Sequence, residues 1–156
     1  MKRKSFVYGI FVMIAGFFVS GCETLNGMGN VDNLLDNEWL FVSVHYTNGN
    51  ILFMTNMAGI NTVIQISNDK MYEKWYTIEG KLVLEKVIGG VIERNNVFFM
   101  IQPVGGNMKY KYYYDASETE LKLTNIQWIY PDNRVEYEVG GSSEVKMYYY
   151  TKQEKR

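Results

Sequence analysis

From Trp39 onward, the chain consists of short runs of β-forming residues separated by turn-forming residues. The runs recur at intervals of about 8–12 residues, which is typical of an all-β domain. Asn48-Gly49 is the strongest turn signal, because both residues tolerate the positive φ that a two-residue hairpin requires. Thirteen tyrosines and eight phenylalanines add strand-forming content, since aromatic side chains fit a pleated, half-buried surface.

These runs predict an antiparallel meander, because most of the connections are too short for anything else. A long meander leaves two exposed edges unless it closes, and closure into a barrel removes them. We therefore expect 8–10 strands in an up-and-down barrel, although a small sandwich or an open barrel would leave a similar pattern. Gly89-Gly90 is expected to connect two of the strands. The expected strands are residues 39–46, 51–55, 62–67, 70–79, 82–87, 91–102 with a break at 95–96, 108–115, 120–130, 135–139 and 144–151.

The first 21 residues have the features of an export signal. Three basic residues follow Met1, and an uncharged stretch of 14 residues then runs from Phe6 to Val19. That stretch is shorter than the roughly 20 residues that a membrane-spanning helix needs. We expect residues 1–21 to form a signal helix that is removed on export.

The signal ends in Val19-Ser20-Gly21-Cys22, and Cys22 is the only cysteine of the chain. This run resembles the lipobox of bacterial lipoproteins. The resemblance implies cleavage between Gly21 and Cys22 and a diacylglyceryl group on the Cys22 thiol, so that the membrane is a partner of the protein. The alternative is a plain signal peptide, or an uncleaved anchor, with a chance cysteine. Glu23, where retained inner-membrane lipoproteins often have Asp, favours the outer membrane of a cell envelope that has one.

Composition limits what the exported part can do. Removal of residues 1–21 leaves 135 residues, which suits one domain of residues 38–151. A tether of residues 22–37, with a short helical turn at 31–35, would precede it, and a charged tail of residues 152–156 would follow. Without Lys2, Arg3 and Lys4, the 16 basic residues fall to 13 against 17 acidic ones. This net charge argues against a nucleic-acid partner, and we expect a monomer.

The region from Trp39 onward looks like the lipocalin-like domains of small bacterial lipoproteins. The resemblance lies in Trp39-Leu40-Phe41-Val42-Ser43-Val44, in Trp75-Tyr76-Thr77-Ile78-Glu79-Gly80-Lys81-Leu82-Val83-Leu84 and in Leu121-Lys122-Leu123. It implies an eight-stranded up-and-down barrel with an apolar cavity.

Residues suited to catalysis or metal binding are scarce. His45 is the only histidine, and we expect it on the same strand face as Ser43, Phe41 and Trp39. One histidine makes a zinc site improbable, and Asp115, Glu118 and Glu120 lack the spacing of a calcium loop. Glu73, Glu79 and Glu85 are spaced by six residues and are expected on solvent-facing positions. We therefore expect no enzyme, no metal and no cofactor.

Aromatic density is the feature that points to binding. Tyr110, Tyr112 and Tyr114 share a strand face, and three tyrosines, Tyr148 to Tyr150, end the last strand. Tyrosine offers a large contact area at low entropy cost, which suits recognition. We expect a small apolar or amphipathic ligand to bind among Trp39, Phe41, Trp75, Tyr112 and Trp128. An envelope interaction protein, which holds a protein or glycan on an outer aromatic face, is the alternative.

Overall fold

The computed structural model describes residues 30–55, 57–140 and 143–154. The predicted signal helix, Gly21, Cys22 and most of the tether lie outside these residues. Within them the predicted all-β fold is confirmed as a closed, antiparallel, up-and-down barrel of eight strands. The strands that form it are β1 (Glu38–Tyr46), β3 (Ile60–Ser67), β4 (Lys70–Thr77), β5 (Leu82–Arg94), β6 (Phe98–Pro103), β7 (Lys109–Ala116), β8 (Glu120–Ile129) and β11 (Ser143–Lys152).

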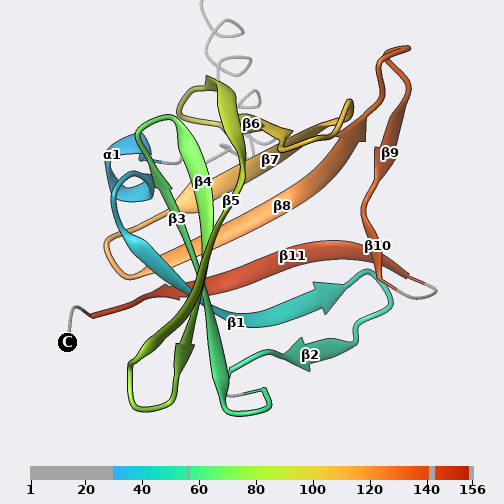
Figure 1. Ribbon diagram of the computed structural model, residues 1–156. Helices are drawn as coiled ribbons and strands as arrows, with labels where there is room; N and C mark the ends of the chain where they lie inside the picture. The colour runs from blue at the N-terminus through green and yellow to red at the C-terminus, as the bar shows by residue number, and fades with distance from the viewer. Residues whose placement is uncertain (1–29, 56, 141–142, 155–156) are drawn as a thin grey trace, which may run out of the picture.

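The barrel is closed by pairing between the last strand and two others. β11 pairs with β1 on one side and with β8 on the other, and the remaining strands follow in chain order from β3 to β8. In Figure 1, β3, β4 and β5 cross the direction of β1, β11 and β8 steeply. The twist that every sheet carries produces this crossing when the sheet closes on itself.

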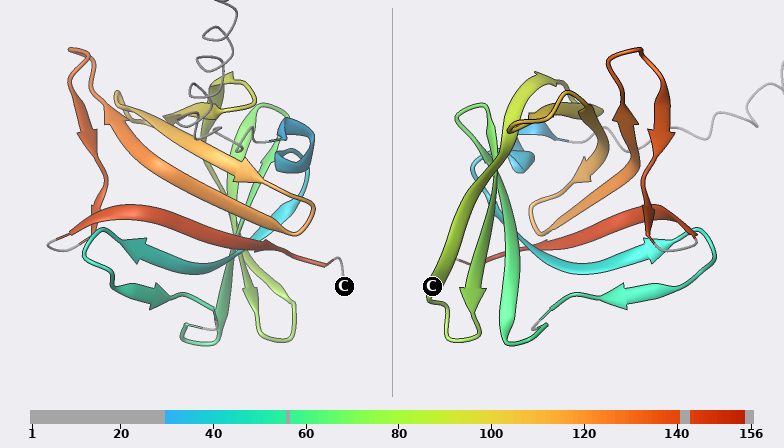
Figure 2. Two further views of the ribbon diagram at one scale, coloured as in Figure 1. Left: turned by 180° about the vertical axis from the view of Figure 1, so that it is seen from behind. Right: turned by 45° about the vertical axis from the view of Figure 1, so that its right-hand side comes forward.

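Three short strands fill places where barrel strands diverge. β2 (Ile51–Phe53) pairs with β1 beyond the point where β1 leaves β3. β9 (Val135–Tyr137) pairs with β8, and β10 (Val139–Gly140) pairs with β11. Figure 2 shows β9 and β10 between the diverging ends of β8 and β11. We had expected one strand over residues 135–139, and the structure divides it at Glu138.

The position of the glycine pair was predicted incorrectly. Gly89-Gly90 does not connect two strands but lies inside β5, where Gly89 pairs with Pro103 of β6. A Cβ atom on Gly89 would lie only 2.4 Å from the main-chain oxygen of Gln102. The glycine is therefore needed for the close approach of two strands, and the turn forms at the Asn95-Asn96 break instead.

A short helix, α1 (Val31–Leu34), covers one end of the barrel. Asn30 caps it, since its side-chain oxygen accepts a hydrogen bond from the backbone N–H of Asp32. Leu34 is fully buried beneath the helix and contributes to the main core cluster. We had placed residues 22–37 in the tether, but the packed body of the protein already includes α1.

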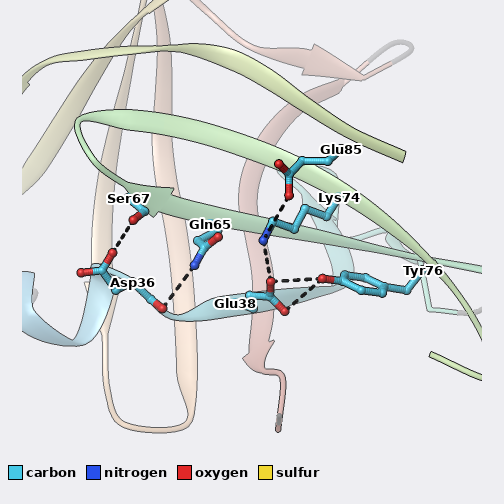
Figure 3. Close-up of polar contacts among 7 residues, drawn as sticks. All are labelled: Asp36, Glu38, Gln65, Ser67, Lys74, Tyr76 and Glu85. Atoms are coloured by element: carbon cyan, nitrogen blue, oxygen red, sulfur yellow. Dashed lines mark hydrogen bonds and ion pairs between the residues drawn. The ribbon is translucent and has the colours of Figure 1, made fainter. Parts of the chain in front are cut away.

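Polar contacts on the outer surface fasten the chain after α1 to β3 and β4 (Figure 3). Lys74 Nζ lies 2.7 Å from Glu38 Oε1 and 3.4 Å from Glu85 Oε2, and the Tyr76 hydroxyl donates to Glu38 at 3.1 Å. Ser67 Oγ donates to the Asp36 carboxylate at 2.5 Å. These contacts fix where α1 meets the barrel, and so they fix which end is covered.

The core fills the half of the barrel next to α1. Its largest fully buried side chains include Trp39, Phe99, Ile101, Leu121 and Leu123. They come from β1, β6 and β8, with Tyr114 of β7 and Tyr150 of β11 packed among them. A second, smaller cluster of Val44, Ile126 and Val145 lies beyond this core, and Phe41, Tyr112 and Tyr148 pack against that cluster.

Candidate functional site

A cavity of about 330 Å³ occupies the barrel interior beyond this core and is partly open to solvent. Aromatic side chains from four strands form much of its wall: Phe41 of β1, Trp75 of β4, Tyr112 of β7, and Tyr148 and Tyr150 of β11. Alternation along each strand places these residues inward. The volume lies within the range of sites that hold small ligands.

Ring contacts hold the aromatic wall in place. Phe41 stacks on Tyr150, with ring centroids 4.9 Å apart, and meets Tyr148 edge-on at 5.4 Å. Tyr112 stacks on the buried Phe99 at 5.0 Å. Such pairs are stabilising beyond the area that they bury, so this part of the wall is preformed.

The remainder of the wall is mostly aliphatic or sulfur-containing. Ile64, Ile88 and Met71 lie toward the core, and Met54 follows β2. Methionine adapts its shape to irregular neighbours, which suits a wall that must fit a variable apolar group.

Glu73 is the carboxylate in the cavity wall, and its position corrects our expectation of a solvent-facing residue. Its Oε1 accepts a hydrogen bond from Trp75 Nε1 at 2.7 Å and lies 3.0 Å from Lys86 Nζ. The same ammonium group lies 5.7 Å from the centre of the Trp75 ring. A carboxylate and an aromatic ring thus hold one cation at this part of the wall.

A second carboxylate lies behind the tyrosines. Glu138, between β9 and β10, accepts a hydrogen bond of 2.5 Å from the Tyr148 hydroxyl. Burial raises the pKa of the Glu138 carboxyl, and the Tyr148 hydroxyl partly offsets this. Burial and the nearby Glu138 charge also raise the pKa of Tyr112 and of Tyr148. The tyrosines therefore keep their protons at neutral pH and present neutral hydroxyl groups.

Three of the five predicted ligand-binding residues come together in this cavity, namely Phe41, Trp75 and Tyr112. Trp39 is not in its wall, because it is fully buried in the core, where its Nε1 donates to the Leu34 carbonyl at 3.2 Å. Trp128 pairs with Tyr110 on the neighbouring strand, with ring centroids 6.1 Å apart, and does not line the cavity either. The predicted lipidation and cleavage residues, Cys22 and Gly21, lie outside the described residues.

Tyr148 and Tyr150 are cavity residues that we did not select, although the tyrosine run of the last strand was visible. Alternation along a strand indicates that Tyr148 and Tyr150 share one face while Tyr149 takes the other. Tyr149 does point outward, where its hydroxyl donates to Glu120 at 2.6 Å. Glu138 carried no signal in the sequence, because its burial depends on how β9 and β10 fold back onto the barrel.

Ser43 and His45 lie on the outer face of the barrel, so the predicted face was wrong. A β-bulge between Phe41 and Ser43 in the pairing with β11 shifts the alternation by one residue. Val44 therefore points into the core, while Ser43 Oγ and His45 Nε2 lie 3.0 Å apart outside it. An apolar surface groove of about 310 Å³ adjoins them, and no carboxylate is among the described residues that line it.

The described residues contain neither a metal-binding cluster nor a membrane-spanning helix. No group of three or more histidine, cysteine, aspartate or glutamate side chains in residues 30–55, 57–140 and 143–154 is arranged to hold a metal ion. In that same part of the chain, no helix is long and apolar enough to cross a membrane.

Comparison with known proteins identifies no relative. No family model, no curated protein and no solved structure matches this chain. The cavity and the sequence motif at Cys22 are therefore the two features that indicate a function.

Proposed function

We propose that the protein is a lipid-anchored binding protein of the bacterial cell envelope, and that its barrel holds a small apolar or amphipathic ligand without catalysing a reaction. The observation that carries the proposal is the aromatic cavity of about 330 Å³ inside a closed barrel. A barrel that served only as a scaffold would gain stability from filling this space, because unfilled apolar volume costs free energy.

The anchor is the second part of the proposal and depends on the lipobox resemblance. The nine Cα-to-Cα steps from Cys22 to Val31 span at most about 30 Å when the chain is fully extended. A lipid on Cys22 would thus keep the α1 end of the barrel close to the membrane surface. The cavity, in the other half, would remain available to ligands from the surrounding compartment.

Ligand binding can be tested with native mass spectrometry and with displacement of the apolar fluorophore N-phenylnaphthylamine. Protein purified from its own host should carry a small molecule, and the fluorophore should compete with it. Phe41→Trp places extra volume in the cavity wall and should weaken fluorophore binding about tenfold or more, since overpacking a filled site costs about 1–3 kcal/mol.

Phe98→Trp is the matched control, because Phe98 lies on the outer side of β6 against Tyr113 and Lys111. This variant should bind the fluorophore as the unchanged protein does. Equal loss of binding in both variants, or no bound molecule together with no fluorophore binding, would count against a cavity ligand.

The anchor has a separate test. Cys22→Ala should abolish labelling by a fatty-acid analogue, block the normal processing at residue 22 and release the protein from membranes. Mass analysis that finds an intact leader and a free thiol on the native chain would overturn the anchor.

The rival function, holding an envelope partner on the outer face, is favoured by one observation. All three residues of β2 are exposed, and Phe53 at 67% is the most exposed of them. Exposed contiguous apolar side chains often mark interaction sites. Stoichiometric co-purification of one protein, lost in Phe53→Ser but retained in Phe41→Trp, would support this reading over the cavity.

A further inference from the structure

The net charge around the cavity is negative, because Lys86 balances Glu73 and no cation among the described residues balances Glu138. Among the described residues that line the cavity there is one carboxylate, Glu73, and no lysine, arginine or histidine. Glu138 adds a second carboxylate directly behind the wall. A barrel site for an anionic amphiphile, such as a fatty acid, would need a positive group to balance the buried charge, and this cavity offers the opposite sign.

The two carboxylates differ in whether a cation already balances them. Glu73 is paired with Lys86 at 3.0 Å. Glu138 has no ion-pair partner among the described residues, and its carboxylate accepts a hydrogen bond from the Tyr148 hydroxyl. Glu138 is partly buried, and an unpaired carboxylate is costly when it is removed from water, so a ligand could balance its charge.

Tyr148 connects Glu138 to the cavity, because Tyr148 lines the cavity and its hydroxyl is bonded to the Glu138 carboxylate. Tyr148 uses its proton in the bond to Glu138, so its oxygen is left as an acceptor. Tyr148 also lines the cavity beside Tyr112 and Phe41. A ligand N–H group that meets this wall finds an acceptor backed by a negative charge, and π faces that attract cations.

The protein already binds one ammonium group in this way. Lys86 Nζ rests between the Glu73 carboxylate and the Trp75 ring at one part of the wall. Glu138, between β9 and β10, repeats the combination of a carboxylate with the aromatic rings of Tyr148 and Tyr112, and no lysine or arginine among the described residues pairs with it.

We infer that the cavity is selective for an organic cation: an amine with an apolar body, whose ammonium group is held by Tyr148 and the charge of Glu138. This inference rests on the proposed function and narrows it to one ligand class. Glu138 acts as a positioning residue for Tyr148 and as the source of the field, while the aromatic wall covers the apolar body.

Three probes with the same eight-carbon chain test the charge preference: octylammonium, 1-octanol and octanoate. Each is titrated calorimetrically into the full chain held in phosphatidylcholine nanodiscs, with empty nanodiscs subtracted. Octylammonium should bind at least about tenfold more tightly than 1-octanol. All three probes bury the same eight-carbon chain, and only octylammonium adds a charged hydrogen bond and a cation–π contact. Octanoate should bind more weakly than the alcohol.

Glu138→Gln and Glu136→Gln form a matched pair, because each removes one negative charge from the same part of the chain. Glu136, unlike Glu138, is already paired with a cation, since Arg134 Nη1 lies 2.8 Å from its Oε1. Glu138→Gln should reduce the preference for octylammonium over octanol to less than about threefold. Glu136→Gln should retain the full preference.

The possible outcomes distinguish a failure of cation selectivity from a failure of the proposed ligand-binding function. Equal binding of octylammonium and octanol would overturn cation selectivity and leave the apolar cavity site standing. No binding of any of the three probes would overturn both. A preference that survives in Glu138→Gln would overturn the role of Glu138, and the comparison of three probes on the unchanged chain decides selectivity even if that variant does not fold.

Discussion

Alanine at Gly89 should destabilise the barrel strongly, whereas alanine at the neighbouring Gly90 should not. A Cβ on Gly89 would lie 2.4 Å from the Gln102 oxygen and 3.0 Å from Pro103 Cα, both in the main chain of β6. The shorter contact is 1.0 Å below the 3.4 Å at which ordinary contact begins. Because no side-chain rotation can relieve it, β5 and β6 must move apart.

The two substitutions should change the free energy of unfolding in opposite directions. Overpacking of this kind costs about 1–3 kcal/mol. At Gly90 the nearest atom to a new Cβ, the main-chain oxygen of Asp69, is 4.0 Å away, and neither glycine has a positive φ. Gly90→Ala should therefore stabilise the fold by about 0.4–1 kcal/mol, through reduced freedom of the unfolded chain.

Urea unfolding followed by tryptophan fluorescence measures the difference. With a slope of about 1–3 kcal/mol per molar urea, the midpoints of the two variants should differ by roughly 1–2 M, with Gly90→Ala the higher. Coincident midpoints would show that β5 and β6 do not approach each other as closely as described, and the reasoning would fail.

Three further predictions concern the core, the buried hydrogen bond and alkaline pH. Leu34→Ala should lower the free energy of unfolding by about 2–5 kcal/mol, since the side chain is fully buried beneath α1, and thermal unfolding measures it. Tyr148→Phe should cost about 1–3 kcal/mol because the Glu138 carboxylate loses its buried donor, whereas Tyr149→Phe, which alters an outer-face contact, should cost less than about 1 kcal/mol. Burial raises the pKa of Tyr114 to about 12, so the folded state holds this proton more tightly than the unfolded chain, whose tyrosine pKa is about 10. The resulting stability is complete below about pH 10 and is lost as pH rises toward 12, which absorbance at 295 nm and unfolding curves at each pH can follow.

Each of these has a result that would contradict it. An unchanged melting temperature in Leu34→Ala would show that α1 does not pack against the barrel. Equal losses in the Tyr148 and Tyr149 variants would mean that Glu138 is not buried, and complete ionisation of all tyrosines near pH 10 would deny the burial of Tyr114.

The fold was predictable because its signals are local. Gly49, Asn68, Asp69 and Gly80 all have positive φ and all stand at turns that the sequence indicated. Such residues fix turns without help from the rest of the chain. Once the turns are fixed, the antiparallel order and the closure follow from the need to cover strand edges.

What the sequence could not indicate depends on contacts between distant segments. The bulge after Phe41 reverses the faces of Ser43 and His45, and it exists only because β1 and β11 pair out of step there. The glycine pair in β5 has the composition of a turn, and only the approach of β6 gives Gly89 its actual role.

The site was partly predictable for the same reason. Trp39 and Phe41 both point inward from β1, and alternation alone cannot say which of them meets a ligand. The answer depends on α1, which packs over Trp39 and leaves Phe41 at the cavity. Glu138 is a carboxylate among seventeen acidic residues, and nothing local distinguishes it from those on the surface.

The position of the chain's last strand has a practical consequence for experiments on this protein. The Gln153 N–H donates to the Glu38 carbonyl at 2.8 Å, and the Lys152 N–H to that of Thr119, so β11 ends beside the start of β1 (Figure 1). A fluorescent reporter or affinity tag fused behind the final residue would emerge next to the helix-covered base. It would leave the ligand entrance unobstructed.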